Sequence, residues 1–291
     1  MAKPPIPATP FYVRALRVAY KVLAIVWPSL GAQIAYKIWF RTPRYNESRR
    51  EQTWRKLALS EAINIDGKKI AVYRWGAITP GYVLFIHGWS GRGVQLGGFV
   101  NSINHSGMGV ISFDAPGHGF SDGNSTNLYE IANAANEIVK KYGPPKAIIA
   151  HSFGCLVSAF LIRKYYLPTE KLVTISCPKK SMYLVFAYQT YFQIPDKIMK
   201  IFHNTIHENF SKDVYLDIST DQNLKKLDID LLMIHDKDDR IVGWEQTQSL
   251  ADDLIKKEKS VETFYTNKLG HTRILRDKDV IAKAAGFITK D

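Results

Sequence analysis

The chain has 291 residues, of which 46% are hydrophobic and 23% are charged, a balance that favours a folded globular protein over a disordered chain or a coiled coil. The formal net charge is +12, and it is unevenly distributed, because residues 1–50 contain nine lysines and arginines and one acidic residue. This distribution excludes an evenly basic face for nucleic acid, and no zinc-finger, RNP or KH pattern is present.

Four prolines in residues 1–10 predict a lead-in that cannot form helix. Residues 11–40 predict helical structure that breaks near Pro28. Two interpretations are open: the helices pack on the rest of the protein or at the entrance to its site, or they form a basic, apolar segment on an anionic membrane surface. The uncharged run Val22–Tyr36 is shorter than the roughly 20 residues that a transmembrane helix needs.

The two cysteines, Cys155 and Cys177, are too few for a disulfide framework and lack the spacing of metal ligands. They favour a reducing compartment, and no signal peptide is evident. We therefore expect a cytoplasmic protein, which the membrane interpretation would place at the inner face of the membrane.

After the N-terminal segment, apolar runs typical of buried parallel strands alternate with helical patterns. A hairpin with its turn at Asp66-Gly67 comes first. The predicted strands that follow are Tyr82–Ile86, Gly109–Phe113, Ala147–Ala150, Lys171–Ser176, Asp230–Ile234 and Ser260–Tyr265. The predicted helices are 94–106, 127–142, 153–166, 244–257 and 278–289. The alternation predicts an α/β fold with a mostly parallel sheet flanked by helices.

Residues 179–228 interrupt this alternation and are rich in aromatic side chains. An excursion of this length is too long for an ordinary loop. We interpret it as a helical cap over the carboxyl ends of the strands, where ligands bind in open α/β sheets. The expected organisation is an N-terminal helical segment at 1–55, a core at 56–178 and 229–291, and the cap at 179–228.

The sequence Ala150-His151-Ser152-Phe153-Gly154 follows a predicted strand and opens a predicted helix. This is the context of a nucleophile elbow, in which small residues two positions before and after the serine permit a sharp turn. Gly154 meets that demand, and Ala150 stands where the first glycine of the pattern usually lies. Ser152 is therefore the candidate nucleophile.

A second motif, His87-Gly88-Trp89-Ser90-Gly91, also follows a strand. Its glycine lets the backbone approach a ligand closely, so the backbone N–H groups of Trp89 and Phe153 are candidate donors to an oxyanion. We expect His87 to be structural. The same applies to Asp114 and His118 in the turn Asp114-Ala115-Pro116-Gly117-His118-Gly119.

An acid and a base complete the set. Asp236, Asp238 and Asp239 follow one strand, and one of these carboxylates would be needed to orient a histidine. His271 comes after the last strand, with Gly270 before it. The chain order of serine, aspartate and histidine is that of the α/β-hydrolases and differs from the orders of chymotrypsin and subtilisin.

Over residues 60–290 the chain resembles the α/β-hydrolase superfamily, and it looks most like bacterial esterase-type members with a short helical cap. The motifs that carry the resemblance are H-G-W-S-G (87–91), D-A-P-G-H-G (114–119), A-H-S-F-G (150–154), H-D-K-D-D-R-I-V (235–242) and G-H (270–271). The resemblance implies Asp239 as the acid, because it lies three residues before Val242, with Asp236 and Asp238 as second choices. It also implies Trp89 and Phe153 as the oxyanion donors.

These residues predict a serine hydrolase, foremost a carboxylesterase for small or medium apolar esters, that needs no metal or organic cofactor. Trp89, Tyr183 and Phe186 are candidate substrate contacts, although the aromatic rings of the cap could equally fill a small core of its own. Lipase or thioesterase activity and a non-catalytic ligand-binding protein are the alternatives. Haloalkane dehalogenase chemistry is disfavoured, because it uses aspartate where Ser152 stands.

Overall fold

The computed structural model describes residues 10–79 and 81–290 and divides into two compact units. One unit contains residues 10–40 and 182–214, and the other contains residues 41–181 and 215–290. The lead-in predicted for residues 1–10 falls almost entirely outside the described residues. Among the described residues, no helix combines the length and the apolar character needed to cross a membrane.

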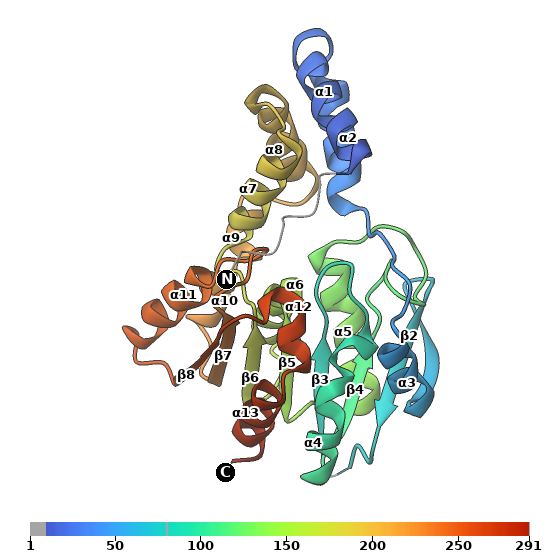
Figure 1. Cartoon of the computed structure of the whole chain (residues 1–291), viewed down its shortest axis with the longest axis vertical. Coiled ribbons are helices and arrows are strands. Elements are labelled where there is room, and N and C mark those ends of the chain that lie inside the picture. Colours follow the sequence, from blue (N-terminus) through green and yellow to red (C-terminus); the bar gives the residue numbers. More distant parts are fainter. Residues whose placement is uncertain (1–9, 80, 291) are drawn as a thin grey trace. The chain divides into compact units, whose positions relative to one another are not determined.

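The larger unit is built on one eight-stranded sheet with the strand order β1-β2-β4-β3-β5-β6-β7-β8 (Figure 1). β1 and β2 form an antiparallel hairpin, and β2 pairs antiparallel with β4. All the other pairings are parallel. The strands are β1 Leu59–Ile65, β2 Lys68–Trp75, β3 Tyr82–Ile86, β4 Gly109–Phe113, β5 Ala147–His151, β6 Lys171–Ile175, β7 Asp230–Asp236 and β8 Val261–Thr266.

The hairpin turn is made by Asp66 and Gly67, whose φ angles of 50° and 77° are both positive. This is the backbone of the tight turn that Asp-Gly favours. The central strands β3, β4 and β5 are buried along their whole length, which means that both faces of the sheet are covered. The predicted α/β fold with a mostly parallel sheet is confirmed.

Helices cover the sheet on either side. One core cluster joins alternate residues of β3, β5, β6 and β7 to η1 (Gly93–Phe99), α4 (Val100–His105) and α13 (Lys278–Thr289). The helices α5 (Leu128–Tyr142) and α6 (Phe153–Lys164) pack against each other, and α10 (Thr220–Leu224) packs on α6. α11 (Glu245–Ile255) packs on β7 and β8.

The parallel register brings the carboxyl ends of β5, β6, β7 and β8 to one edge of the sheet. His151 pairs with Ile175, and Asp236 pairs with Thr266. The loops that follow β5, β7 and β8 therefore begin at the same edge, and these loops contain the candidate nucleophile, acid and base. This is the edge at which ligands bind in such sheets.

The smaller unit contains the helices α1 (Phe11–Val26), α2 (Pro28–Phe40), α7 (Ser181–Phe192, from its second residue) and α8 (Asp196–Asn209). α2 packs on α8, and their aromatic rings form a cluster in which Trp39 lies 5.1 Å from Tyr188 and 6.0 Å from Phe202, measured between ring centroids. The Tyr188 hydroxyl donates to the Ala35 carbonyl at 2.9 Å. Several aromatic residues of the insertion thus fill a core within this unit.

The bounds of the two units differ in part from the expected domain boundaries. The smaller unit ends at Phe40, whereas the predicted N-terminal segment extends to residue 55. α3 (Arg49–Leu57) packs on η1 in the larger unit. The Trp54 ring lies so close to Gly97 that a methyl group added there would be 2.3 Å from Cγ of the ring, so the absence of a side chain at Gly97 makes room for it. The start of α3 carried a sequence signal, a capping box in which Ser48 and Glu51 bind each other's backbone amides.

The inserted segment is also divided between the units. Residues 182–214 belong to the smaller unit, whereas the last part of the predicted cap, from residue 215, belongs to the larger one. The reason is local: Thr220 donates to the Pro178 carbonyl at 2.8 Å, and Asn223 binds the Arg163 guanidinium on α6 at 3.0 Å.

Candidate active site

Ser152 occupies a sharp turn between β5 and α6. Its φ and ψ angles are 53° and −119°, a backbone region that costs a non-glycine residue about 1–3 kcal/mol. The turn is held by a hydrogen bond from the Ser152 amide to the Ile175 carbonyl at 2.9 Å. A methyl group at Gly154 would lie 2.4 Å from the Ile86 carbonyl oxygen. A small residue is therefore required two positions after the serine because the backbone of β3 lies too close for a side chain there.

His271 meets Ser152 across the sheet edge. Its Nε2 lies 3.0 Å from the Ser152 hydroxyl oxygen. The sequence predicted a loop at this position, and the structure has a single helical turn, α12 (Gly270–Arg273). Gly270 precedes His271 with a φ of 65°, a conformation that glycine adopts without a steric penalty. Two residues 119 positions apart are thus brought within hydrogen-bonding distance.

Asp239 completes the arrangement. Its Oδ2 lies 2.7 Å from Nδ1 of His271, and its Oδ1 accepts hydrogen bonds from the amides of Ile241 and Val242 at 2.9 and 3.0 Å. Burial by itself would raise the pKa of Asp239, but hydrogen bonds from His235 and His271 hold the pKa well below its usual value. The carboxylate is therefore ionised at neutral pH and can orient the imidazole.

The other two candidate carboxylates have different partners. Asp236 is fully buried and accepts hydrogen bonds from the Leu269 and Gly270 amides at 3.1 and 2.8 Å. Asp238 accepts one from the Lys268 amide at 2.8 Å. Both carboxylates hold the backbone that leads to His271, and neither contacts its ring. The geometry therefore selects Asp239 among the three.

Both the sequence and the fold of the chain are similar to those of known proteins. A family model described as the alpha/beta hydrolase fold matches residues 81–196, a stretch that contains the first oxyanion motif and the nucleophile elbow. The eight-stranded sheet has the mostly parallel order expected of it. The chain has the α/β-hydrolase fold.

Solved structures with this fold superimpose on most of the chain. An esterase from Exiguobacterium antarcticum aligns with a TM-score of 0.60 at 15% identity, over 80% of this chain and 100% of that one. The thioesterase domain from the curacin biosynthetic pathway gives 0.59 at 14% identity, over 80% and 99%. The 2-hydroxy-6-oxo-6-phenylhexa-2,4-dienoate hydrolase of Rhodococcus sp. strain RHA1 gives 0.59 at 13% identity, over 79% and 98%. These likenesses show the fold. No curated protein is significantly similar to the chain in sequence.

Two buried histidines beside Ser152, Asp239 and His271 were not singled out from the sequence. His151 donates from Nε2 to the backbone carbonyl of His271 at 2.9 Å. Burial, together with the neighbouring His271, lowers the pKa of His151 to about 3. His151 therefore stays neutral and fixes the main chain of His271. Its place directly before Ser152 was the available signal.

His235 lies beside the Asp239 carboxylate. Its Nε2 donates to the Val242 carbonyl at 2.9 Å and lies 3.3 Å from Oδ2 of Asp239, and both side chains are inaccessible to solvent. Its Nδ1 lies 2.7 Å from the Thr247 hydroxyl. No sequence pattern separates His235 from an ordinary residue at the end of a buried strand, because its partners come from the loop and helix that follow.

The candidate oxyanion donors lie beside the nucleophile. Phe153 is the first residue of α6, where an amide has no acceptor within the helix. The Trp89 ring packs edge-on against the Phe153 ring, with their centroids 5.1 Å apart. The adjacent Gly88 is close enough that a methyl group there would lie 3.0 Å from Cβ of Ser152. The loop that bears Trp89 thus approaches the elbow closely.

His87 and His118 hold that loop in place. The Ala115 amide donates to Nε2 of His87 at 3.0 Å, and the Ser90 amide donates to Nε2 of His118 at 3.0 Å. Burial lowers the pKa of His87 to about 4 and that of His118 to about 3, so both rings remain neutral acceptors. Asp114 is likewise buried and accepts from the Gly93 amide at 2.7 Å. All three have the structural role expected of them.

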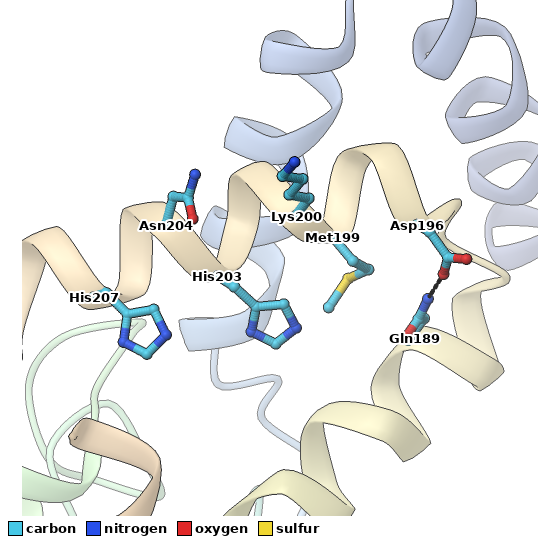
Figure 2. Close-up of a pocket in the computed structure, with 7 residues that line it drawn as sticks. All are labelled: Gln189, Asp196, Met199, Lys200, His203, Asn204 and His207. Carbon is cyan, nitrogen blue, oxygen red and sulfur yellow. Dashed lines mark hydrogen bonds between the residues drawn. The ribbon is translucent and has the colours of Figure 1, made fainter. Parts of the chain in front are cut away.

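The remaining candidates belong to the smaller unit. Tyr183 and Phe186 lie on α7, and Phe186 is exposed. A hollow of about 400 Å³ lies along α8 in the same unit, with Met199, His203 and His207 on its wall and a hydrogen bond between Gln189 and Asp196 at one end (Figure 2). The hollow contains none of the triad residues.

Proposed function

We propose that the protein is a serine hydrolase, foremost a carboxylesterase that acts on small or medium apolar esters. The observation that carries the proposal is the continuous hydrogen-bonded path from the Ser152 hydroxyl through His271 to the Asp239 carboxylate, with distances of 3.0 and 2.7 Å. A serine without a catalytic role would have no need of an imidazole whose second nitrogen is held by an ionised carboxylate.

The reaction follows from the positions of these groups. As the Ser152 oxygen attacks the ester carbonyl carbon, Nε2 of His271 takes the hydroxyl proton. The resulting imidazolium is stabilised by Asp239, which remains ionised. His271 then gives the proton to the departing alkoxide, so that an alcohol leaves and an acyl-serine remains. A water molecule, deprotonated by the same imidazole, then attacks the carbonyl carbon of the acyl-serine. As the bond between that carbon and the Ser152 oxygen breaks, His271 returns the proton to the Ser152 oxygen, which releases the acid and restores the free serine.

The charge that develops on the carbonyl oxygen needs fixed donors. We assign this role to the backbone amides of Trp89 and Phe153, which belong to two segments that meet at the elbow. One such donor is typically worth about 2.7–4 kcal/mol of transition-state stabilisation. Since both are main-chain groups held by the loop and by α6, they need no reorganisation as the charge forms.

A thioester or a longer-chain ester would undergo the same chemistry. A thioesterase domain is among the proteins with this fold, so thioesters are the second candidate substrate class. The two classes differ in their leaving group, an alkoxide in one case and a thiolate in the other. The triad serves both, and the choice therefore rests on binding.

Turnover of p-nitrophenyl esters with acyl chains of increasing length tests the proposal. We expect the wild type to hydrolyse the short and medium esters, and Ser152→Ala to lower kcat by roughly 10⁴–10⁶-fold. Ser106→Ala, in which the serine lies outside the site and binds Ile103, is the matched control and should keep full activity. Acyl-CoA thioesters measured in parallel decide between the two substrate classes. A folded wild type that is inactive on all of them would support the non-catalytic alternative instead.

A further inference from the structure

The helix α1 has one face that is accounted for by packing. Val13 and Tyr20 are completely buried, and α1 packs on α2 and α8. Arg17 lies on the same side and donates two hydrogen bonds to the Tyr191 carbonyl at the end of α7, at 3.1 and 2.7 Å. These contacts fix which side of α1 faces its own unit.

The opposite face of α1 is apolar and exposed. At 100° per residue it covers about 140° of the circumference, and it presents no charged side chain. Of the eighteen large apolar side chains that are exposed among the described residues, seven fall between residues 11 and 27. They have exposed fractions of 52–80%, and they are Phe11, Tyr12, Val18, Val22, Ile25, Val26 and Trp27. We call these seven residues, with Ala15 and Ala19 between them, the outer face of α1.

Positive charge borders the outer face. Arg14 and Lys21 are exposed and fall next to each other along one edge of it, almost two turns apart. Residues 10–40 contain four lysines and arginines and no acidic residue. The described part of the smaller unit as a whole has seven basic and three acidic residues. The surface is thus apolar in the middle and positive along one edge.

The aromatic residues of the outer face lie at its two ends. Phe11 and Tyr12 begin the helix, and Trp27 occupies the turn between α1 and α2 (Figure 1). Tyrosine and tryptophan prefer the boundary between lipid headgroups and acyl chains, because one part of each ring system is apolar and another forms hydrogen bonds. The aliphatic residues Val18, Val22 and Ile25 lie between them.

We propose that the outer face of α1 docks on the surface of a bilayer that contains anionic phospholipids. Soluble monomers rarely expose so large a contiguous apolar surface without a partner. The sixteen residues of α1 give a length of about 24 Å, and no described helix can cross a membrane. The helix would therefore lie in the headgroup region, with its apolar side toward the acyl chains and Arg14 and Lys21 against the phosphates.

Other occupants fit less well. Nucleic acid is bound through phosphate contacts and stacked bases, which valine and isoleucine do not provide. A second copy of the chain docked on this face would add a second Arg14 and Lys21 to the same interface. An anionic surface instead complements these charges. The inference does not depend on the proposed hydrolase activity, since it uses no residue of the triad.

Co-sedimentation of the full-length protein with vesicles tests the docking. One set contains phosphatidylcholine with phosphatidylglycerol at 3:1, and the other contains phosphatidylcholine alone. We expect clear binding to the anionic set. Val22→Glu/Ile25→Glu should weaken that binding by about tenfold or more, because both side chains lose their favourable burial in the acyl region. Arg14→Gln/Lys21→Gln should weaken it by about fivefold for each charge removed, and only on the anionic vesicles.

Matched variants lie at and just after the C-terminal end of α11 in the larger unit. Ile255→Glu changes a residue with the same 52% exposure as Val22, and Lys256→Gln/Lys257→Gln removes two exposed charges. Neither should alter vesicle binding. The Tm of each variant shows whether it is folded, and size-exclusion chromatography reports self-association. Equal binding by the α1 and α11 variants would overturn the proposal. The proposal would also be overturned if the wild type did not bind anionic vesicles and instead formed a dimer that Val22→Glu/Ile25→Glu dissociates.

Discussion

At the scale of single residues, the site shows how three neighbouring carboxylates acquire different roles. Asp239 faces the His271 ring, whereas Asp236 and Asp238 bind backbone amides of residues 268–270. From the sequence, the resemblance to the α/β-hydrolases implied Asp239, which lies three residues before Val242, with Asp236 and Asp238 as second choices. The role of Asp236 could not be predicted, since the amides it binds are 33 and 34 residues away and reach it only through the pairing of β7 with β8.

Asparagine substitutions separate these roles. Asp239→Asn should lower kcat by about 10⁴-fold, because the amide no longer stabilises the imidazolium or holds the required tautomer. Asp238→Asn should leave kcat within a few-fold of the wild type. Asp236→Asn should mainly lower the Tm, since it weakens a buried network of backbone hydrogen bonds. Steady-state kinetics on a p-nitrophenyl ester and thermal unfolding measure both effects. A larger loss of kcat in Asp238→Asn than in Asp239→Asn would reassign the acid.

At the scale of elements, the buried strands were the most predictable part of the fold. β3 and β4 have the predicted bounds, because continuous apolar runs between turn residues have few alternatives in an α/β chain. The helix α3 was missed, since only Trp54 and the capping box mark it in a polar stretch. The division of the inserted segment was also missed, because it depends on which aromatic residues find partners within the smaller unit.

Two glycines test how closely the elements pack at the elbow. Gly154→Ala should lower the free energy of unfolding by about 1–3 kcal/mol, because the added methyl meets the Ile86 and His87 carbonyl oxygens at 2.4 and 2.7 Å. Gly286→Ala is the matched control within α13, where nothing lies within 4 Å of the added methyl. It should raise the free energy of unfolding by about 0.5–1 kcal/mol. Urea unfolding measures both, and a neutral Gly154→Ala would contradict the close approach of α6 to β3.

At the scale of the whole molecule, the buried histidines make stability depend on pH. His87, His118 and His151 have pKa values lowered to about 4, 3 and 3, whereas an unfolded histidine has a pKa of about 6.5. Below pH 6.5 the unfolded chain therefore binds protons that the folded chain does not, and stability falls as the pH falls. The loss continues down to the folded pKa values. Asp239, whose pKa is also lowered, adds a further loss only below about pH 4.

Removing one of these histidines should flatten that dependence. Each contributes up to about 1.4 kcal/mol per pH unit between pH 6 and pH 4.5. His118→Gln, which retains a hydrogen-bond acceptor for the Ser90 amide, should reduce the slope by about one proton. The measurement is the free energy of unfolding in urea at several pH values. An unchanged slope would mean that His118 is protonated in the folded protein.

The account as a whole depends on Ser152 being an activated nucleophile, and a fluorophosphonate probe tests this most directly, because it reacts with such a serine and forms a stable phosphonyl adduct. Peptide mass spectrometry then locates the adduct. We predict one adduct in the wild type, on the peptide that contains Ser152, and no adduct in Ser152→Ala. His271→Ala should be labelled much more slowly than the wild type. A folded wild type that stays unlabelled, or equal labelling of Ser152→Ala, would contradict the account.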